Sequence, residues 1–299
     1  METFKSAMAF SFCNINRWKK DCRVWLVLLF TLFLIIEYLK GYTIYGMAEG
    51  KKMTFCLLPV LFQSSEISLR APKILWHTGF ILLLCDAPFL YQNAPYVIMR
   101  SGRKRWWLGE CMYIFEVAFI YMLFITIASS AVSVPVISFE NDWGEALTDF
   151  LYGTDTKTVE DLLKQYKLGL WAPEMAVNML YPFASQAYTF CTGLASFFIL
   201  GLLVYLINLV QKNILWGLGA AFILVFLDPL LSFSAKPSRY WLHAFSPVCW
   251  TSVECINILG SRFFISIPFV TVTSFIVISI LIILIALSSR KIMIETRES

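Results

Sequence analysis

The sequence predicts an all-α integral membrane protein with six transmembrane helices. Of its 299 residues 59% are hydrophobic and 15% are charged, whereas a soluble domain carries about a quarter charged residues. Six apolar runs approach or exceed the roughly 20 residues that cross a bilayer. They span residues 24–40, 74–91, 111–134, 187–210, 214–233 and 264–287. The ten tryptophans fall at the ends of these runs or in loops, as an aromatic belt at the membrane surface requires. We therefore treat residues 1–299 as a single transmembrane domain.

Residues 1–23 predict an interfacial helix that lies on the inner membrane surface. The segment mixes basic residues with Trp18, a composition typical of amphipathic helices at the headgroup level. The apolar run that follows starts at Val24 and is closed by Lys40 without a small-residue cleavage site. We therefore expect a retained span rather than a cleaved secretory signal.

Two connections follow the first two spans. Between the first and second spans, the apolar piece from Phe55 to Phe62 is too short to cross a membrane and contains Pro59, so we expect a surface or re-entrant segment. After the second span, residues 93–110 are short, basic and aromatic. The ordinary interpretation of that stretch is a cytoplasmic loop that obeys the positive-inside rule. The alternative, more specific interpretation is a docking segment on which another protein pushes to move the adjoining spans.

Local signals place a short helix within this basic stretch. Asn93 is a candidate N-cap, Pro95 is tolerated in a first helical turn, and Gly102 can end the helix in the left-handed conformation.

Residues 136–180 form the least apolar region, with eight acidic and three basic side chains. Thr158 and Asp161 fit the capping-box pattern, with Asp in place of the usual Glu or Gln. Apolar residues then recur at helical spacing as far as Tyr166. A second helix candidate spans Asp142 to Tyr152. We expect short amphipathic helices in the extracellular loops, lying on the outer membrane face.

The connection Gln211 to Asn213 permits only a tight turn, so spans 187–210 and 214–233 are expected to run antiparallel side by side.

The orientation of the chain in the membrane is predicted from the distribution of Lys and Arg. With both termini inside, segments 1–23, 93–110, 211–213 and 288–299 hold 13 of the 24 basic residues. The positive-inside rule then predicts a multi-pass plasma-membrane protein with both termini cytoplasmic.

Motifs for several kinds of chemistry are missing. The sequence has no phosphate-binding loop, no His-Glu-x-x-His zinc pair and no Gly-x-Ser-x-Gly nucleophile turn. His243, Cys249 and Cys255 match no zinc spacing. We therefore predict no catalytic residue, no metal site, no cofactor on this chain and no nucleic-acid partner. Whether Cys249 and Cys255 pair outside the membrane stays open.

Acidic residues lie within or near the spans. Charges there are costly and normally face a bundle interior, a cavity or a partner. Asp86 and Glu116 lie in the inner halves of their spans, without an intramembrane Arg, Lys or His that would form a proton relay, so we assign them to a substrate pathway or a helix contact. Asp228 joins this set of candidates, although it and Glu110 lie close enough to span ends to be solvated.

On these features the chain resembles the permease subunit of type-2 ABC exporters. Residues 5–20 match that family's amphipathic N-terminal helix. The stretch Arg100-Ser-Gly-Arg-Lys-Arg-Trp-Trp-Leu-Gly109 resembles its basic-hydrophobic entry into the third span, with Glu110 where Lys is common. Phe245-Ser-Pro247 to Trp250 resembles the Ser/Asn-Pro-aromatic segment after the fifth span.

The resemblance implies an ATP-driven exporter in which this chain pairs with a second permease copy or paralogue in the lipid membrane. Separate cytosolic ATP-binding subunits would hold ATP and Mg and hydrolyse the nucleotide. They would dock on the connection between spans two and three. The residues implied for this coupling are Tyr96, Met99, Arg100, Arg103, Lys104 and Arg105. The implied cargo is an antimicrobial peptide or another amphipathic compound.

Two other functions stay open at this point. The first is a non-enzymatic membrane sensor or immunity protein that binds a ligand through its extracellular loops, chiefly residues 136–180. The second is a secondary transporter, which the absence of inverted repeats and broken-helix signatures disfavours.

Overall fold

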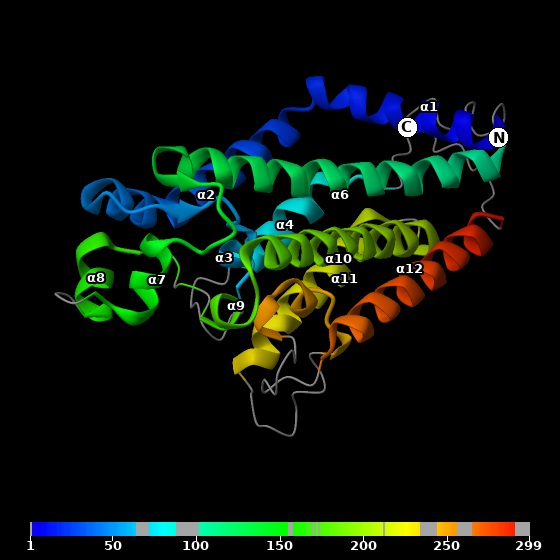
Figure 1. The fold of residues 1–299 in the computed structure, drawn as a ribbon. Coiled ribbons are helices and arrows are strands. Elements are labelled where there is room, and N and C mark those ends of the chain that lie inside the picture. The colour runs from blue at the N-terminus through cyan, green and yellow to red at the C-terminus, as the bar shows by residue number, and fades with distance from the viewer. Residues whose placement is uncertain are drawn as a thin grey trace.

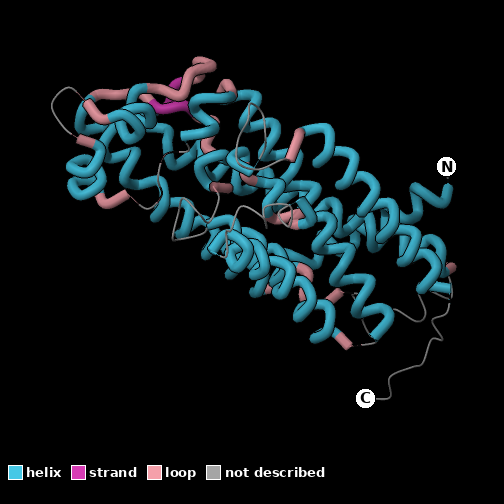
Figure 2. Tube along the Cα trace, turned by 90° about the horizontal axis from the view of Figure 1, so that it is seen from below, coloured by secondary structure: helices cyan, strands magenta, loops and turns pink. Residues whose placement is uncertain are grey.

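The protein is an elongated bundle of helices with a smaller helical cap at one end (Figure 1). The computed structural model describes residues 2–63, 72–87, 102–154, 158–168, 170, 172, 174–211, 213–233, 244–255 and 265–290. The two short strands lie at the end of the bundle away from the N-terminus (Figure 2). The expected all-α class is confirmed, and the described residues contain one pair of two-residue strands besides the helices.

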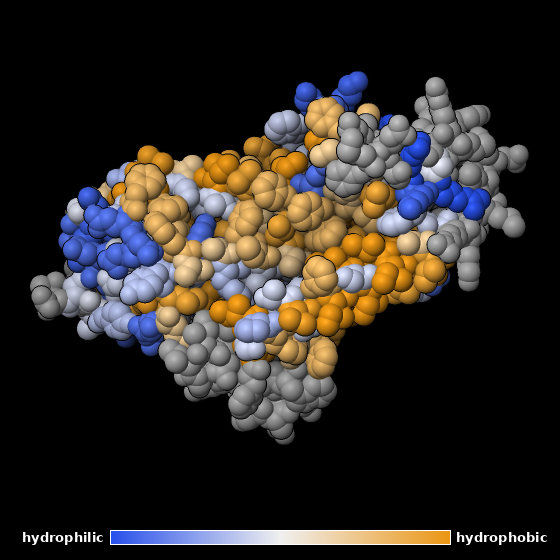
Figure 3. Space-filling model, turned by 45° about the vertical axis from the view of Figure 1, so that its right-hand side comes forward, coloured by the Kyte–Doolittle hydropathy of each residue, from blue (hydrophilic) through white to orange (hydrophobic). Residues whose placement is uncertain are grey.

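Four described helices are long and apolar enough to cross a membrane. They are α2 (Cys22–Glu49), α6 (Arg103–Ser133), α10 (Pro182–Gln211) and α12 (Ile267–Arg290). Their outward faces are apolar, and Figure 3 shows a hydrophobic band between more hydrophilic regions. The other two predicted spans correspond to α4 (Pro72–Leu83) and α11 (Ile214–Phe233), which pack against each other. With twelve residues, α4 is shorter than the roughly 20 that a straight crossing needs. Six spans therefore stay a prediction.

The predicted N-terminal helix is present as α1 (Glu2–Arg17), followed by the 3-10 turn η1 (Trp18–Lys20). It packs along α6, because Gly109 lets the two backbones approach: a Cβ at Gly109 would lie 3.2 Å from the carbonyl oxygen of Ala7. The indole of Trp18 donates a hydrogen bond to the hydroxyl of Tyr113 at 2.8 Å. One face of this helix is thus covered by protein, which the expectation of a purely interfacial helix did not include.

Helix α2 runs nine residues beyond the predicted end at Lys40. Asp21 caps its start by accepting a hydrogen bond from the backbone N–H of Arg23. Gly50, with a φ of 67°, ends it in the left-handed conformation that glycine adopts without strain. The extra turns carry Tyr42 and Tyr45, which are buried under the cap. Tertiary packing on the cap therefore extends the helix past the membrane-length apolar run.

The cap is built from α7 (Glu145–Tyr152), α8 (Val159–Tyr166), α9 (Glu174–Met179) and the strands β1 (Met53–Thr54) and β2 (Ile137–Ser138). The strands pair in parallel, with Met53 opposite Ile137. The predicted capping box is confirmed, since Thr158 and Asp161 exchange backbone and side-chain hydrogen bonds. These hydrogen bonds from Thr158 also lower the pKa of the Asp161 carboxyl.

A polar contact ties the cap to α2. The hydroxyl of Tyr45 donates a 2.6 Å hydrogen bond to Asp149 on α7, and the ammonium of Lys51 binds the same carboxylate oxygen. This contact with Asp149 raises the pKa of Lys51. The cap therefore sits on the end of α2 through both aromatic packing and charge.

The short apolar piece after β1 is buried rather than on the surface. It forms α3 (Leu58–Leu61), whose four residues are fully buried, with Phe62 after it. The backbone N–H of Leu58 donates to the side chain of Gln186 on α10, and the indole of Trp76 on α4 donates to the carbonyl of Leu61. Of the two predicted alternatives, the surface position is wrong and a segment packed among the long helices is observed.

Helices α10 and α11 pack against each other, whereas Lys212 in the predicted tight turn lies outside the described residues. Asn208 fixes this pair from within. Its side-chain oxygen accepts from the backbone N–H of Gly217 and its side-chain nitrogen donates to the carbonyl of Ala87, both at 2.7 Å. One amide thus joins α10, the first turns of α11 and the segment after α4. Farther along the chain, the 3-10 turns η4 (Cys249–Thr251) and η5 (Val253–Cys255) pack on the start of α10.

Candidate functional site

A buried ion pair joins α4 to α11. The ammonium of Lys73 lies 2.8 Å from the carboxylate of Asp228, and both side chains are 0% exposed. Lys73 is the second described residue of α4, where the helix dipole disfavours a cation. The carboxylate of Asp228 therefore offsets both the charge of Lys73 and its unfavourable position.

One turn along α4, His77 continues the polar interior. Its Nδ1 contacts the carbonyl oxygen of Lys73, and its Nε2 lies 2.9 Å from the hydroxyl of Ser196 on α10. Because a carbonyl oxygen can only accept, Nδ1 carries a proton. In the neutral ring Nε2 then accepts from the hydroxyl of Ser196. The imidazole also packs edge-on against Phe197, with ring centroids 4.8 Å apart.

Two thiols complete this cluster on the side of η4 and η5. The sulfurs of Cys249 and Cys255 lie 2.8 Å apart, both side chains are buried and neither is in a disulfide. Both are close enough to the ammonium of Lys73 to act on it electrostatically. Burial raises the pKa of the Cys249 thiol well above its ordinary value. We call Lys73, His77, Ser196, Asp228, Cys249 and Cys255 the buried polar cluster.

This cluster is a buried polar contact that joins α4 to α11, to α10 and to the turns η4 and η5. Removing two charges from water costs several kcal/mol per ion, so a buried pair is weak evidence for stability. Charged residues inside a membrane bundle more often mark a pathway or a contact that changes. Among the described residues, no group of three or more His, Cys, Asp and Glu side chains is arranged to hold a metal ion.

The predicted carboxylates make three different helix contacts. Asp228 is the fully buried partner of Lys73, so the expectation that it is solvated is wrong. Glu116 accepts a hydrogen bond from Ser11 on α1. Asp86 lies in the turn after α4, is 55% exposed along its side chain and binds Arg23 at 2.6 Å. Arg23, from the predicted interfacial segment, therefore accompanies Asp86, a pairing that the sequence did not predict. A role for any of the three in a substrate pathway stays a prediction.

Glu110 was expected at a solvated span end and is instead 0% exposed. The groups that face its carboxylate are Trp106 on α6 together with Asn14 and Arg17 on α1. The ring of Tyr205 on α10 packs against Trp106, with centroids 6.3 Å apart. The docking of α1 explains this burial, because it covers the part of α6 that a bare span end would expose.

The predicted coupling residues divide between described and undescribed parts of the chain. Tyr96, Met99 and Arg100, together with the helix predicted from Asn93, lie outside the described residues. Arg103, Lys104 and Arg105 form the first turn of α6, eight residues before the predicted start of that span. Gly102 has a positive φ of 83° and directly precedes α6. The three basic side chains are therefore on a continuous helix and not in a loop.

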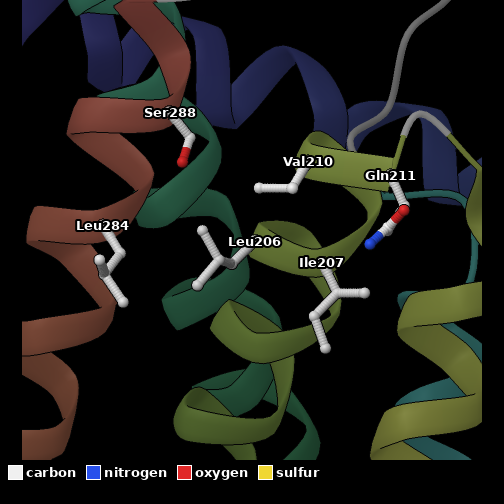
Figure 4. A pocket seen from close by; sticks show the side chains of 6 residues that line it. All are labelled: Leu206, Ile207, Val210, Gln211, Leu284 and Ser288. Carbon is white, nitrogen blue, oxygen red and sulfur yellow. The ribbon is translucent and has the colours of Figure 1, made fainter.

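Two apolar grooves open on the outside of the bundle. One, of about 320 Å³, lies between α10 and α12, where Leu206 and Leu284 face each other and Gln211 and Ser288 supply the polar groups (Figure 4). The other, of about 250 Å³, is lined by Glu116, Cys111 and apolar residues of α6, α10 and α12. The first groove has no charged lining residue, so it suits an apolar chain rather than a charged ligand.

Sequence reasoning missed Lys73 and His77. The predicted span 74–91 leaves Lys73 in the connection before it and places His77 near its start, with no role for either side chain. The signal that could have found them is their i, i+4 spacing, which places both on one face of a helix. A carboxylate elsewhere in the apolar sequence then has a candidate partner on that face.

No family model, curated protein or solved structure matches this chain.

Proposed function

We propose that this chain is the transmembrane permease subunit of an ATP-driven exporter of the type-2 ABC class. The observation that supports the proposal most is the position of the basic turn Arg103–Arg105. It starts α6 at the same end of the bundle as the start of α1 and the end of α12 (Figure 1). The opposite end carries the acidic cap. The positive-inside rule then puts the basic turn in the cytoplasm, where a soluble subunit can reach it.

Helix α6 is suited to transmit a push. Its 31 residues extend about 46 Å at 1.5 Å per residue, from the basic turn to the cap. Along this length it contacts α1 through Ser11 and Glu116, and α2 through the 3.1 Å hydrogen bond between Thr31 and Tyr121. A displacement at the basic turn would therefore move α1, α2 and α6 together, as in rigid-body transitions.

In this proposal ATP and Mg are bound by the partner subunits, and the permease contributes no catalytic residue. A second permease copy or paralogue completes the substrate pathway. The cargo is an antimicrobial peptide or another amphipathic compound. The buried polar cluster lies between helices that would shift relative to one another when the two permeases rock.

Charge reversal at the basic turn tests the coupling. We expect Arg103→Glu combined with Arg105→Glu to reduce co-purification with the proposed ATP-hydrolysing partner subunit by at least about tenfold, because the reversed charges would repel the surface that the basic turn attracts. The matched control is Lys52→Glu with Lys164→Glu, the same reversal on the cap. Equal ATPase recovery from both double variants would refute the coupling role.

Epitope tags at residues 155 and 295 test the topology. In intact cells we expect the tag at 155 to bind antibody and the tag at 295 to require permeabilisation, because the acidic cap is predicted outside and the basic tail inside. Antibody access to 295 without permeabilisation would invert the orientation.

A second candidate function is ligand sensing or immunity through the cap. The observation that favours it is the exposed aromatic surface there: Phe139 and Tyr181 are 74% and 73% exposed, and Phe55 packs against Phe139 with centroids 5.6 Å apart. Such a protein would protect cells in the absence of any ATPase subunit, whereas the exporter would not. Deleting the ATPase gene and measuring resistance separates the two functions.

A further inference from the structure

The thiols of Cys249 and Cys255 have no part in the proposed coupling, yet the fold brings them together. Their sulfurs are 2.8 Å apart, with both side chains buried. A disulfide needs an S–S distance of about 2.05 Å, so the two sulfurs have to approach by only about 0.8 Å. The hydrogen bonds of the neighbouring turns hold the two residues in place, since the backbone N–H of Cys255 donates to the carbonyl of Ser252 and that of Ser252 donates to Cys249.

The surroundings give this pair a defined place in the fold. Between the cysteines, the carbonyl of Trp250 accepts a 2.8 Å hydrogen bond from Tyr188 on α10, and the indole of Trp250 donates to Ala244. The turns η4 and η5 thus close over the outer part of α10 and face the pair of Lys73 and Asp228. In the predicted orientation this is the extracellular side, where disulfides persist.

We propose that Cys249 and Cys255 are a covalent modification site that is oxidised to a disulfide by exchange with an external thiol oxidant of the disulfide class. One thiolate attacks the oxidant R–S–S–R, which forms a mixed disulfide and releases R–SH. The second thiolate attacks the protein sulfur of the mixed disulfide, which closes the bridge and releases the second R–SH. Two electrons and two protons pass from the cysteines to the oxidant, so atoms and charge balance.

The burial of the site fixes when this exchange takes place. Thiolate is the nucleophile, and burial raises the pKa of the Cys249 thiol, so the folded, reduced protein holds little of it. Both sulfurs are also shielded from a macromolecular oxidant. The bridge therefore forms while η4 and η5 are still open during folding, and it resists reduction afterwards.

The disulfide would hold the turns η4 and η5 in a fixed position over the ion pair of Lys73 and Asp228. The bridge ties Cys249 to Cys255 and so keeps Trp250 on Tyr188. The inference shares only the membrane orientation with the proposed function and is independent of any ATPase.

The test counts thiols in the full-length protein taken directly from cells. Membranes are quenched in acid, denatured in SDS with N-ethylmaleimide, and digested for mass spectrometry with and without prior reduction. We expect Cys249 and Cys255 to be alkylated only after reduction. Cys56 is the matched control: it is also buried, burial raises its pKa to about 11, and it has no neighbouring thiol, so it is alkylated without reduction.

Single variants keep the test falsifiable if the protein tolerates loss of the bridge. In Cys249→Ser we expect Cys255 to be alkylated without reduction, and the reverse in Cys255→Ser. Reduction is expected to lower the thermal unfolding midpoint of the wild type but not of the double serine variant. Full alkylation of both wild-type cysteines without reductant overturns the inference, whatever the ATPase co-purification shows.

Discussion

Replacing Lys73 by methionine is expected to lower the free energy of unfolding by about 3–5 kcal/mol, because the carboxylate of Asp228 stays buried without its partner. The change removes an ammonium that is 0% exposed and 2.8 Å from Asp228, while the methionine fills a similar volume. Thermal unfolding in detergent, followed by size-exclusion chromatography of the soluble fraction, measures the loss. We expect Asp228→Asn to have an effect of similar size, since it leaves the ammonium of Lys73 buried without its carboxylate partner.

The double variant Lys73→Met with Asp228→Leu removes both charges. It therefore separates the net contribution of the ion pair to the free energy of unfolding from the cost of leaving one buried charge without a partner. Buried ion pairs exchanged for packed apolar residues are often neutral in stability. We therefore expect the double variant to recover most of the stability that Lys73→Met loses. The exposed pair of Lys164 and Glu160, with side chains 73% and 75% exposed, is the control: Lys164→Met is expected to leave the unfolding midpoint unchanged. Equal thermal unfolding midpoints for Lys73→Met and the wild type would contradict an ion pair that is fully buried away from water.

Replacing Gly217 by valine is expected to separate α10 from α11. A Cβ at Gly217 would lie 2.6 Å from the carbonyl oxygen of Val204 and 2.2 Å from the side-chain oxygen of Asn208. The backbone of α10 cannot give way, and a shift of Asn208 also breaks its hydrogen bond to Ala87. We expect a loss of about 2–4 kcal/mol from overpacking and from buried polar groups left without partners.

Gly219 supplies the matched control on the same helix. A Cβ there meets nothing within 4 Å, so Gly219→Ala is expected to leave the unfolding midpoint unchanged or to stabilise the helix by up to about 1 kcal/mol. The same thermal assay compares the two variants. If Gly217→Val were as stable as Gly219→Ala, the close packing of α10 on α11 would be wrong.

How much of the fold could be predicted depends on where the physical signal lies. Apolar runs are local in the sequence, so the positions of α2, α6, α10 and α12 were predicted, and the capping box at Thr158 was found from side-chain spacing alone. The ends were not: α2 continues to Glu49 because Tyr42 and Tyr45 pack under a cap that lies about 100 residues later in the chain. Tertiary contacts of this kind leave no local pattern.

The candidate site was predicted only in part for the same reason. The carboxylates were visible because a charge in an apolar run stands out, and Asp228 was among the candidates. Its partner Lys73 lies at the boundary of a polar connection, where lysine is ordinary, so a sequence-local argument places it in solvent. The pairing is set by how α4 and α11 pack, which no spacing rule gives. For Arg103 to Arg105 the basic character was predicted, but not that these residues start a helix.

The docking of α1 on α6 has a consequence for biosynthesis. Ser11 and its partner Glu116 are 105 residues apart, and a ribosome adds roughly 5–20 residues per second. The N-terminal helix therefore waits on the order of 5–20 s before its binding site exists. During this delay Ala7 and Ser11, buried in the finished protein, have to be sheltered by the lipid surface or by a chaperone. The basic residues Arg17, Lys19 and Lys20 give α1 an affinity for anionic headgroups. The membrane surface can therefore bind α1 until α6 has been synthesised.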